Sequence, residues 1–211
     1  MDTHTLVTTR RGLHAVAEHL LAGPQERAHG TIHLRVSDGG FAPVHGPWRV
    51  EGAELVGGGG RVPLTGTLAD VAAAAGIAGP AVPGGYDTHA DWPAGRPLEI
   101  DPAAAATLAG WFARGDAALD AFAPYADRVL WPEHFDLGLV RDEVNYGVSP
   151  GDAGHPEPYA YVGPWAPRSG PFWNAPFGAL RPAADLPDVA ALTAFLLAGR
   201  DAAIRPRRAR R

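Results

Sequence analysis

Residues 131–165 read WPEHFDLGLVRDEVNYGVSPGDAGHPEPYAYVGPW, and the fold class of the whole chain depends on how this stretch is interpreted. Apolar and polar residues alternate along three of its segments, which predicts strands over residues 129–140, 143–149 and 158–164. The connections between the segments are short, so neighbouring strands are expected to pair in an antiparallel sheet. The apolar sides of the strands would then form one core face, and the polar sides would share the other face.

The shared polar face is the candidate functional site. Its side chains would come from all three strands and are His134, Asp136, Glu143, Asn145, Tyr159 and Tyr161. Gly147 and Gly163 fall on the same face, where the lack of a side chain would leave space for a ligand. The sequence therefore predicts a pocket floored by two glycines and surrounded by acidic, amide, imidazole and phenol groups.

The loop after the second strand and two tryptophans complete the candidate site. The polar loop residues at its rim would be Ser149, Asp152, His155 and Glu157. Trp131 and Trp165 would wall the pocket. Glu143, Asn145 and Tyr159 would then hold a small polar or partly aromatic ligand by hydrogen bonds.

Three interpretations of this polar face are open. In the first, His134 and Asp136 form an H-x-D pair that binds a divalent metal, with His155 or Glu157 as a third ligand. In the second, His134 and Asp136 are catalytic, with His134 as the general base oriented by Asp136 or Glu143. In the third, the polar face only maintains the fold of a non-catalytic structural or protein-interaction domain.

Residues 147–151 match the G-x-S-x-G pattern of serine hydrolases, with Ser149 at the nucleophile position. In those enzymes the residue after the serine donates a backbone N–H to the oxyanion. Here that residue is Pro150, which has no N–H. No helix is predicted to follow it either, so Ser149 is not expected to be a nucleophile.

Composition excludes several other classes of function. The chain has no Cys, which excludes disulfides, thiolate nucleophiles and Cys-ligated metals. All 18 basic residues are Arg, which excludes Schiff-base and P-loop lysines. Five of these Arg lie in the last seven residues, so the rest of the chain is acidic and unsuited to nucleic acid. No apolar run reaches the length of a membrane span. We therefore expect a cytoplasmic protein whose partner is a small molecule.

Periodicity elsewhere in the chain predicts four helices, over residues 13–21, 67–76, 101–122 and from 185 or 188 to about 204. Thr8 or Thr9 would cap the first helix, and Gly23-Pro24 would end it. Further strands are predicted at residues 31–36, 48–52 and 54–56. The resulting fold class is α+β, with antiparallel sheet of short strands packed against three to four helices.

A chain of 211 residues is expected to form one domain, here residues 1–205. Residues 77–97 are rich in Pro and Gly and read as a loop, so the domain could consist of two halves, 1–85 and 98–205. Residues 206–211 carry like charges and almost no apolar surface, which predicts a disordered Arg-rich tail.

The second half also resembles a family of uncharacterised, conserved actinobacterial proteins and a broader bacterial domain of unknown function. The resemblance is carried by WPEHFDL at residues 131–137, SPGD at 149–152 and PEPYAYV at 156–162. In the broader domain the position of Ser149 is often aromatic, which further weakens a nucleophile role. The resemblance implies that these motifs form a family signature, and it implies no particular chemistry.

Overall fold

The computed structural model describes residues 2–84, 90–93 and 95–204 of the chain. Within these residues, ten strands form one antiparallel sheet in the order β10-β9-β8-β7-β6-β1-β2-β3-β4-β5. The strands are β1 (Leu34–Ser37), β2 (Gly40–Pro43), β3 (Trp48–Glu51), β4 (Glu54–Gly57), β5 (Gly60–Pro63), β6 (Val129–Trp131), β7 (Asp136–Arg141), β8 (Val144–Ser149), β9 (Tyr159–Pro164) and β10 (Ala179–Pro182). The predicted α+β class with short antiparallel strands is confirmed, although the sheet has more strands than the sequence indicated.

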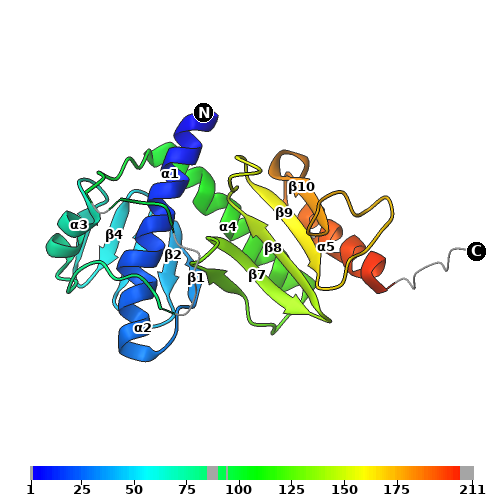
Figure 1. Ribbon diagram of the computed structural model, residues 1–211, viewed down its shortest axis with the longest axis horizontal. Coiled ribbons are helices and arrows are strands. Elements are labelled where there is room, and N and C mark those ends of the chain that lie inside the picture. The colour runs from blue at the N-terminus through cyan, green and yellow to red at the C-terminus, as the bar shows by residue number, and fades with distance from the viewer. Residues whose placement is uncertain (1, 85–89, 94, 205–211) are drawn as a thin grey trace, which may run out of the picture.

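The sheet consists of two meanders that meet at one narrow junction. The first meander contains β1–β5 and the second contains β6–β10, and they join where Leu34 of β1 pairs with Leu130 of β6. Both leucines are fully buried. Figure 1 shows the first meander on the left and the second on the right. Residues from both halves of the chain therefore share one sheet.

The helices are α1 (Thr3–Val16), the π-helix η1 (Ala17–Ala22), α2 (Gly23–His29), α3 (Leu68–Ala75), α4 (Pro102–Phe122), the 3₁₀ turn η2 (Ala183–Asp185) and α5 (Val189–Ile204). Three predicted helices are confirmed as α3, α4 and α5. Their N-terminal caps explain why: Thr67 and Asp70 form a capping box, Asp101 accepts from Ala104 N–H, and Asp188 accepts from Ala191 N–H.

Helices α4 and α5 cover one face of β7–β9, behind the strands in Figure 1. A glycine in each helix allows it to approach the strands closely. A Cβ on Gly115 of α4 would lie 2.3 Å from Val148 Cγ2, and one on Gly199 of α5 would lie 2.6 Å from Val162 Cγ2. The covered face carries the apolar side of the strands, including the buried Tyr146. The opposite face of these three strands is the one that the sequence predicted to be polar.

The first helix differs from its prediction at both ends. It begins at Thr3, because Asp2 accepts a hydrogen bond from Thr5 N–H and serves as the N-cap. It also continues past Gly23-Pro24 to His29, through the π-helical turn η1. Pro24 lies in the first turn of α2, where its missing N–H is tolerated. The prediction of a helix confined to residues 13–21 was therefore wrong.

The segment predicted as one strand, 129–140, is a hairpin of β6 and β7. Residues 132–135 form its turn, and Phe135 has a φ of 52°. Strands β2, β5 and β10 were not predicted, because each has four residues and includes or borders Gly or Pro. The described parts of 77–97 contain no helix or strand, as expected for a loop. The Arg-rich tail lies outside the described residues.

Candidate functional site

A cavity of about 1130 Å³ lies between α1 and the face of β7–β9 that faces away from α4 and α5. Alternate residues of β8 and β9, together with the start of β7, form the wall on the sheet side. The wall on the helix side consists of Val7, Arg10, Arg11 and His14 of α1. Figure 1 shows α1 running in front of β1 and β2, beside the second meander. The polar strand face is therefore one side of a two-sided site.

The structure brings most of the predicted site residues to this cavity. Those that line it are His134, Asp136, Asn145, Ser149, Asp152, Tyr159, Tyr161, Gly163 and Trp165. Trp165 is 63% exposed, and its indole N–H donates to Asn145 Oδ1 at 3.3 Å. Phe177, which the sequence did not single out, lies on the same wall and stacks on Tyr159 with ring centroids 6.4 Å apart.

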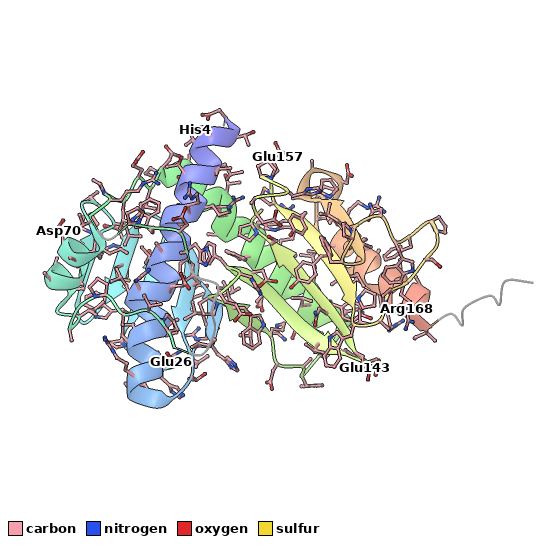
Figure 2. All side chains as sticks on the ribbon, in the orientation of Figure 1. His4, Glu26, Asp70, Glu143, Glu157 and Arg168 are labelled. Atoms are coloured by element: carbon pink, nitrogen blue, oxygen red, sulfur yellow. The ribbon has the colours of Figure 1, made fainter. Side chains whose placement is uncertain are left out.

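Four predicted site residues lie outside the described cavity wall: Trp131, Glu143, His155 and Glu157. Trp131 is the last residue of β6, and its ring packs edge-on against the ring of His33. Glu143 shares the two-residue turn between β7 and β8 with Asp142, where φ values of 53° and 59° leave both side chains exposed. Figure 2 shows Glu143 and Glu157 at opposite ends of the second meander.

Tyr161 occupies part of the space that the sequence analysis assigned to a ligand. In the sheet, Gly138 of β7, Gly147 of β8 and Tyr161 of β9 lie in register. A Cβ on Gly147 would lie 2.5 Å from the Tyr161 hydroxyl oxygen, and one on Gly138 would lie 2.7 Å from it. Gly147 therefore makes room for the phenol ring and not for a ligand, which corrects its predicted role. Gly163 does line the cavity.

Asp136 is the most unusual group in this wall. Its Oδ2 accepts a hydrogen bond from the Tyr161 hydroxyl, while its buried Oδ1 has no partner among the described residues. Burial raises the pKa of Asp136 above its ordinary value, although the Tyr161 hydrogen bond and the nearby His134 act in the opposite direction. Burial and then the charge of Asp136 also raise the pKa of Tyr161 well above its ordinary value. Tyr161 therefore stays protonated and remains the donor.

Arg10 of α1 fixes the loop after β8 against the cavity. Its guanidinium donates to the carbonyl oxygen of Pro156 at 2.9 Å and to that of Asp152 at 3.2 Å. Gly151 makes this contact possible, because its φ is 102° and a Cβ there would lie 2.4 Å from Arg10 Nη1. The conformation of the SPGD segment is thus fixed by a helix residue far away in the sequence.

Asp152 stabilises the same loop from within. Its Oδ1 accepts from the backbone N–H groups of Gly154 and His155 at 2.6 and 2.7 Å, and its Oδ2 accepts from the Tyr159 hydroxyl at 2.5 Å. Burial raises the pKa of Asp152, but the hydrogen bonds from Tyr159 and the backbone outweigh it, and the pKa lies below its ordinary value. Asp152 is therefore ionised, and its oxygens already hold the loop.

Two histidines border the cavity. His14 Nε2 lies 2.6 Å from the Pro132 carbonyl oxygen, which can only accept, so Nε2 carries the proton and Nδ1 is left as an acceptor. Burial lowers the pKa of His14, so its ring is neutral, and it stacks on Phe135 at 5.4 Å. His134 is more exposed, with its Nε2 3.1 Å from Glu133 Oε1. Glu133 is thus the carboxylate in direct contact with His134, and the charge of His134 also acts on Asp136.

Sequence reasoning missed the whole contribution of α1. Arg10, Arg11 and His14 fall at i, i+1 and i+4 of one helix, where they form a polar strip beside the buried Leu6 and Leu13. The predicted cap at Thr8 or Thr9 already placed these residues on a helix. The sequence did not show that this helix packs beside the polar face of β7–β9, so the strip was not assigned to the site.

The described residues do not support the metal interpretation. No three His, Asp or Glu side chains among them are grouped so that they could hold a metal ion. His155 and Glu157, the predicted third ligands, lie outside the cavity wall that contains His134 and Asp136. Within the part of the chain that the structure describes, the H-x-D pair therefore lacks the third ligand that a facial triad requires.

The hydrogen bonds of Ser149 stabilise the end of β8 and the loop that follows it. Its hydroxyl oxygen accepts from Gly151 N–H at 3.1 Å, and its carbonyl oxygen accepts from the Trp111 indole N–H at 2.9 Å. The segment after it is an irregular loop and not a helix. The geometry thus agrees with the sequence argument against a nucleophile.

Comparison with protein-family models, with curated proteins and with solved structures gave no match to this chain. Separately, none of the described helices is both long and apolar enough to cross a membrane.

Proposed function

We propose that this protein binds a small molecule in the cavity between α1 and β7–β9. The observation that carries the proposal is Asp136, which lines the cavity and whose buried Oδ1 finds no partner within the described parts of the chain. A buried polar atom left unsatisfied typically destabilises a fold by ~1–3 kcal/mol. A ligand that donates a hydrogen bond to this oxygen would remove that penalty.

The composition of the wall supports the same proposal. Small-molecule sites are concave and combine aromatic surface with a few converging polar groups. Here Tyr159, Trp165 and Phe177 supply aromatic surface, and Asp136 and His134 supply polar groups on the same cavity. The alternative, a structural or interaction domain, predicts a filled cluster in which the polar groups satisfy one another.

If the protein is an enzyme, the His134–Glu133 pair is the acid–base group that we propose. Histidine is the side chain most often used for proton transfer, and a carboxylate that fixes its ring is the usual support. His134 borders the cavity, and Glu133 holds its Nε2 at 3.1 Å. Asp136 would then bind the substrate beside it.

The proposal is tested by filling the cavity. In Gly163→Leu the new side chain would enter it, since a Cβ at Gly163 has its nearest neighbour at 3.5 Å and fits without strain. Gly60→Leu is the matched control, because Gly60 is also a strand glycine but is exposed, with nothing within 4 Å of its Cβ. Both variants should fold.

The measurements are native mass spectrometry of the purified protein and ligand-observed NMR against a library of small molecules. We expect wild type and Gly60→Leu to retain or bind the same compounds and Gly163→Leu to lose them. Compounds that bind all three proteins equally, or a library without a single hit on the wild type, would favour the structural alternative.

A further inference from the structure

We infer that the ligand is an organic cation, with an ammonium group that donates to Asp136 Oδ1 and an apolar or aromatic body that extends along β8 and β9 toward Trp165. The inference rests on the proposed function and names the chemical class of its ligand. Three independent features of the cavity support it: its unmatched charge, its aromatic wall and its length.

The charges of the cavity favour a cation. The described lining residues include two Arg, and each has an acidic neighbour. Arg11 contacts Asp91 at 3.0 Å. Arg10 donates to the backbone carbonyl of Asp152, and the negative charge of Asp152 favours the charged form of Arg10. Of the other carboxyl groups in the described wall, that of Asp152 accepts from Tyr159 and two backbone N–H groups, whereas Asp136 and Glu133 have neither an Arg contact nor a backbone donor from the loop. An anionic ligand would meet these two acids, whereas an ammonium group would complement them.

The aromatic side chains suit the remainder of such a ligand. Trp165 and Phe177 are 63% and 45% exposed, and both line the cavity although they are large apolar residues. Exposed aromatic faces bind planar or aliphatic groups, and they also attract cations through the π system. Tyr159 extends this surface toward Asp136, with its ring 6.4 Å from both the Phe177 and the Tyr161 rings.

The sheet register gives the distance between the two ends of the site. Leu137 pairs with Val148, so Asp136 lies level with Ser149 at one end of β8. Trp165 contacts Asn145, four residues away on the same strand. At the usual rise per residue this separation is about 14 Å. The cavity therefore accommodates an elongated molecule with its charge at one end.

Binding of an ammonium group should depend on pH. Burial raises the pKa of the Asp136 carboxyl, and the groups that face it are Tyr161 from β9 and Glu133 and His134 from the β6–β7 turn, with His14 and Arg10 of α1 on the same cavity. An ammonium group favours the ionised carboxylate. At a pH where free Asp136 is partly protonated, binding would release a proton, and affinity would rise with pH until Asp136 is ionised in the free protein.

Three probes with one indole-ethyl body and different head groups test the inference: tryptamine, tryptophol and indole-3-propionate. Their dissociation constants are measured with the full chain by calorimetry and by NMR. We expect tryptamine to bind at least roughly tenfold more tightly than tryptophol, as a charge-assisted hydrogen bond allows, and indole-3-propionate to bind most weakly. Tryptamine affinity should rise as the pH increases above the ordinary Asp pKa of about 3.9, and that of tryptophol should not.

Variants assign the effect to Asp136. Asp136→Asn should weaken tryptamine roughly tenfold and leave tryptophol nearly unchanged. The matched control is Asp142→Asn, since Asp142 is exposed in the β7–β8 turn and does not line the cavity. Trp165→Ala should weaken both probes, because both share the indole body. If Asp136→Asn does not fold, the pH profile of the wild type decides the same question.

The outcomes separate the two proposals. Equal or tighter binding of tryptophol or indole-3-propionate, abolished by Gly163→Leu, would overturn the cationic class and leave the cavity as a ligand site. Binding of none of the three probes would also overturn it, while the library test with Gly163→Leu and Gly60→Leu decides the proposed function separately.

Discussion

At the scale of single residues, Asp136 links stability and function. Its carboxyl is buried beside Tyr161, and burial raises its pKa in the folded protein above that of the unfolded chain. A group of this kind favours folding fully at a pH below its unfolded pKa, and that contribution is lost as the pH rises through the folded pKa. Asp136 therefore destabilises the fold at pH values above its unfolded pKa unless a ligand compensates it.

Asp136→Asn should consequently raise the melting temperature at about pH 7, because the amide oxygen still accepts from Tyr161 and no charge is buried. The difference from wild type should shrink as the pH falls and vanish below the unfolded pKa of about 3.9. Asp136→Ala should cost less than ~1 kcal/mol, because Asp136 borders a cavity where water can meet Tyr161. Circular dichroism melts at several pH values check this. A markedly lower melting temperature of Asp136→Asn at neutral pH would mean that the carboxylate is a structural acceptor.

The two glycines that were predicted to floor the pocket should respond oppositely to substitution. A Cβ on Gly147 would lie 2.4 Å from the Leu137 carbonyl oxygen and 2.5 Å from the Tyr161 hydroxyl, so Gly147→Ala should destabilise by ~1–3 kcal/mol through overpacking. Gly163→Ala meets its nearest atom at 3.5 Å and should change stability by less than ~0.5 kcal/mol. Urea unfolding of both variants measures the contrast. Similar losses for the two would show that Tyr161 does not occupy the space above Gly147.

At the scale of elements, the two hydrogen bonds from Arg10 to the loop over residues 150–158 form a clasp that joins α1 to the second meander. Arg10→Ala would leave the carbonyl oxygens of Asp152 and Pro156 without their donor, and we expect a loss of about 2–3 kcal/mol. The neighbouring Arg11→Ala is the control, since its exposed pair with Asp91 should be worth less than ~1 kcal/mol. The midpoints of denaturant unfolding give these losses, provided that the unfolding free energy falls with denaturant at the same slope in each variant. Hydrogen exchange should rise in the loop of Arg10→Ala only, and unchanged exchange there would argue against the clasp.

Elements with local signals could be predicted from the sequence, and those that depend on tertiary contacts could not. Thr67-Asp70 and Asp101-Pro102 carry their capping signals within a few residues, so α3 and α4 were predicted closely. The turn at residues 132–135 was missed because Phe135 adopts a φ of 52°, held by packing against His14, Phe41 and Phe112. Pro132 marks the start of this turn, but Phe135 is not a residue that favours a positive φ.

For the candidate site too, local signals were predictable from the sequence and tertiary contacts were not. Alternation along β8 and β9 was enough to place Asn145, Tyr159 and Tyr161 on one face, because strand periodicity is a local property. The wall from α1 depends on how a helix packs across the sheet, which periodicity does not specify. The identity of Tyr161 as the filler above Gly147 depends on strand register, which only pairing reveals.

At the scale of the whole molecule, the junction between the meanders should make the two halves of the chain unfold together. Leu34 and Leu130 are both fully buried and form the β1–β6 pairing, and α4 packs against strands of both meanders. Leu130→Ala would leave a cavity at this junction and should cost about 2–5 kcal/mol. The loss should appear in both halves at once, because the sheet and α4 are shared.

The measurement is hydrogen exchange at low denaturant, followed by mass spectrometry of peptides from β2–β4 and from β8–β9. In the wild type the slowest amides of the two regions should share one opening free energy, and Leu130→Ala should lower both by the same amount. The matched control is Leu196→Ala, which removes an equally buried leucine of α5, away from the β1–β6 junction. If the chain unfolds as one cooperative unit, Leu196→Ala should also lower the opening free energy of both regions by the same amount. If either variant loosened β8–β9 and left β2–β4 protected, residues 1–85 and 98–205 would be separate folding units, and the cavity between α1 and β7–β9 would lie at the boundary of two domains.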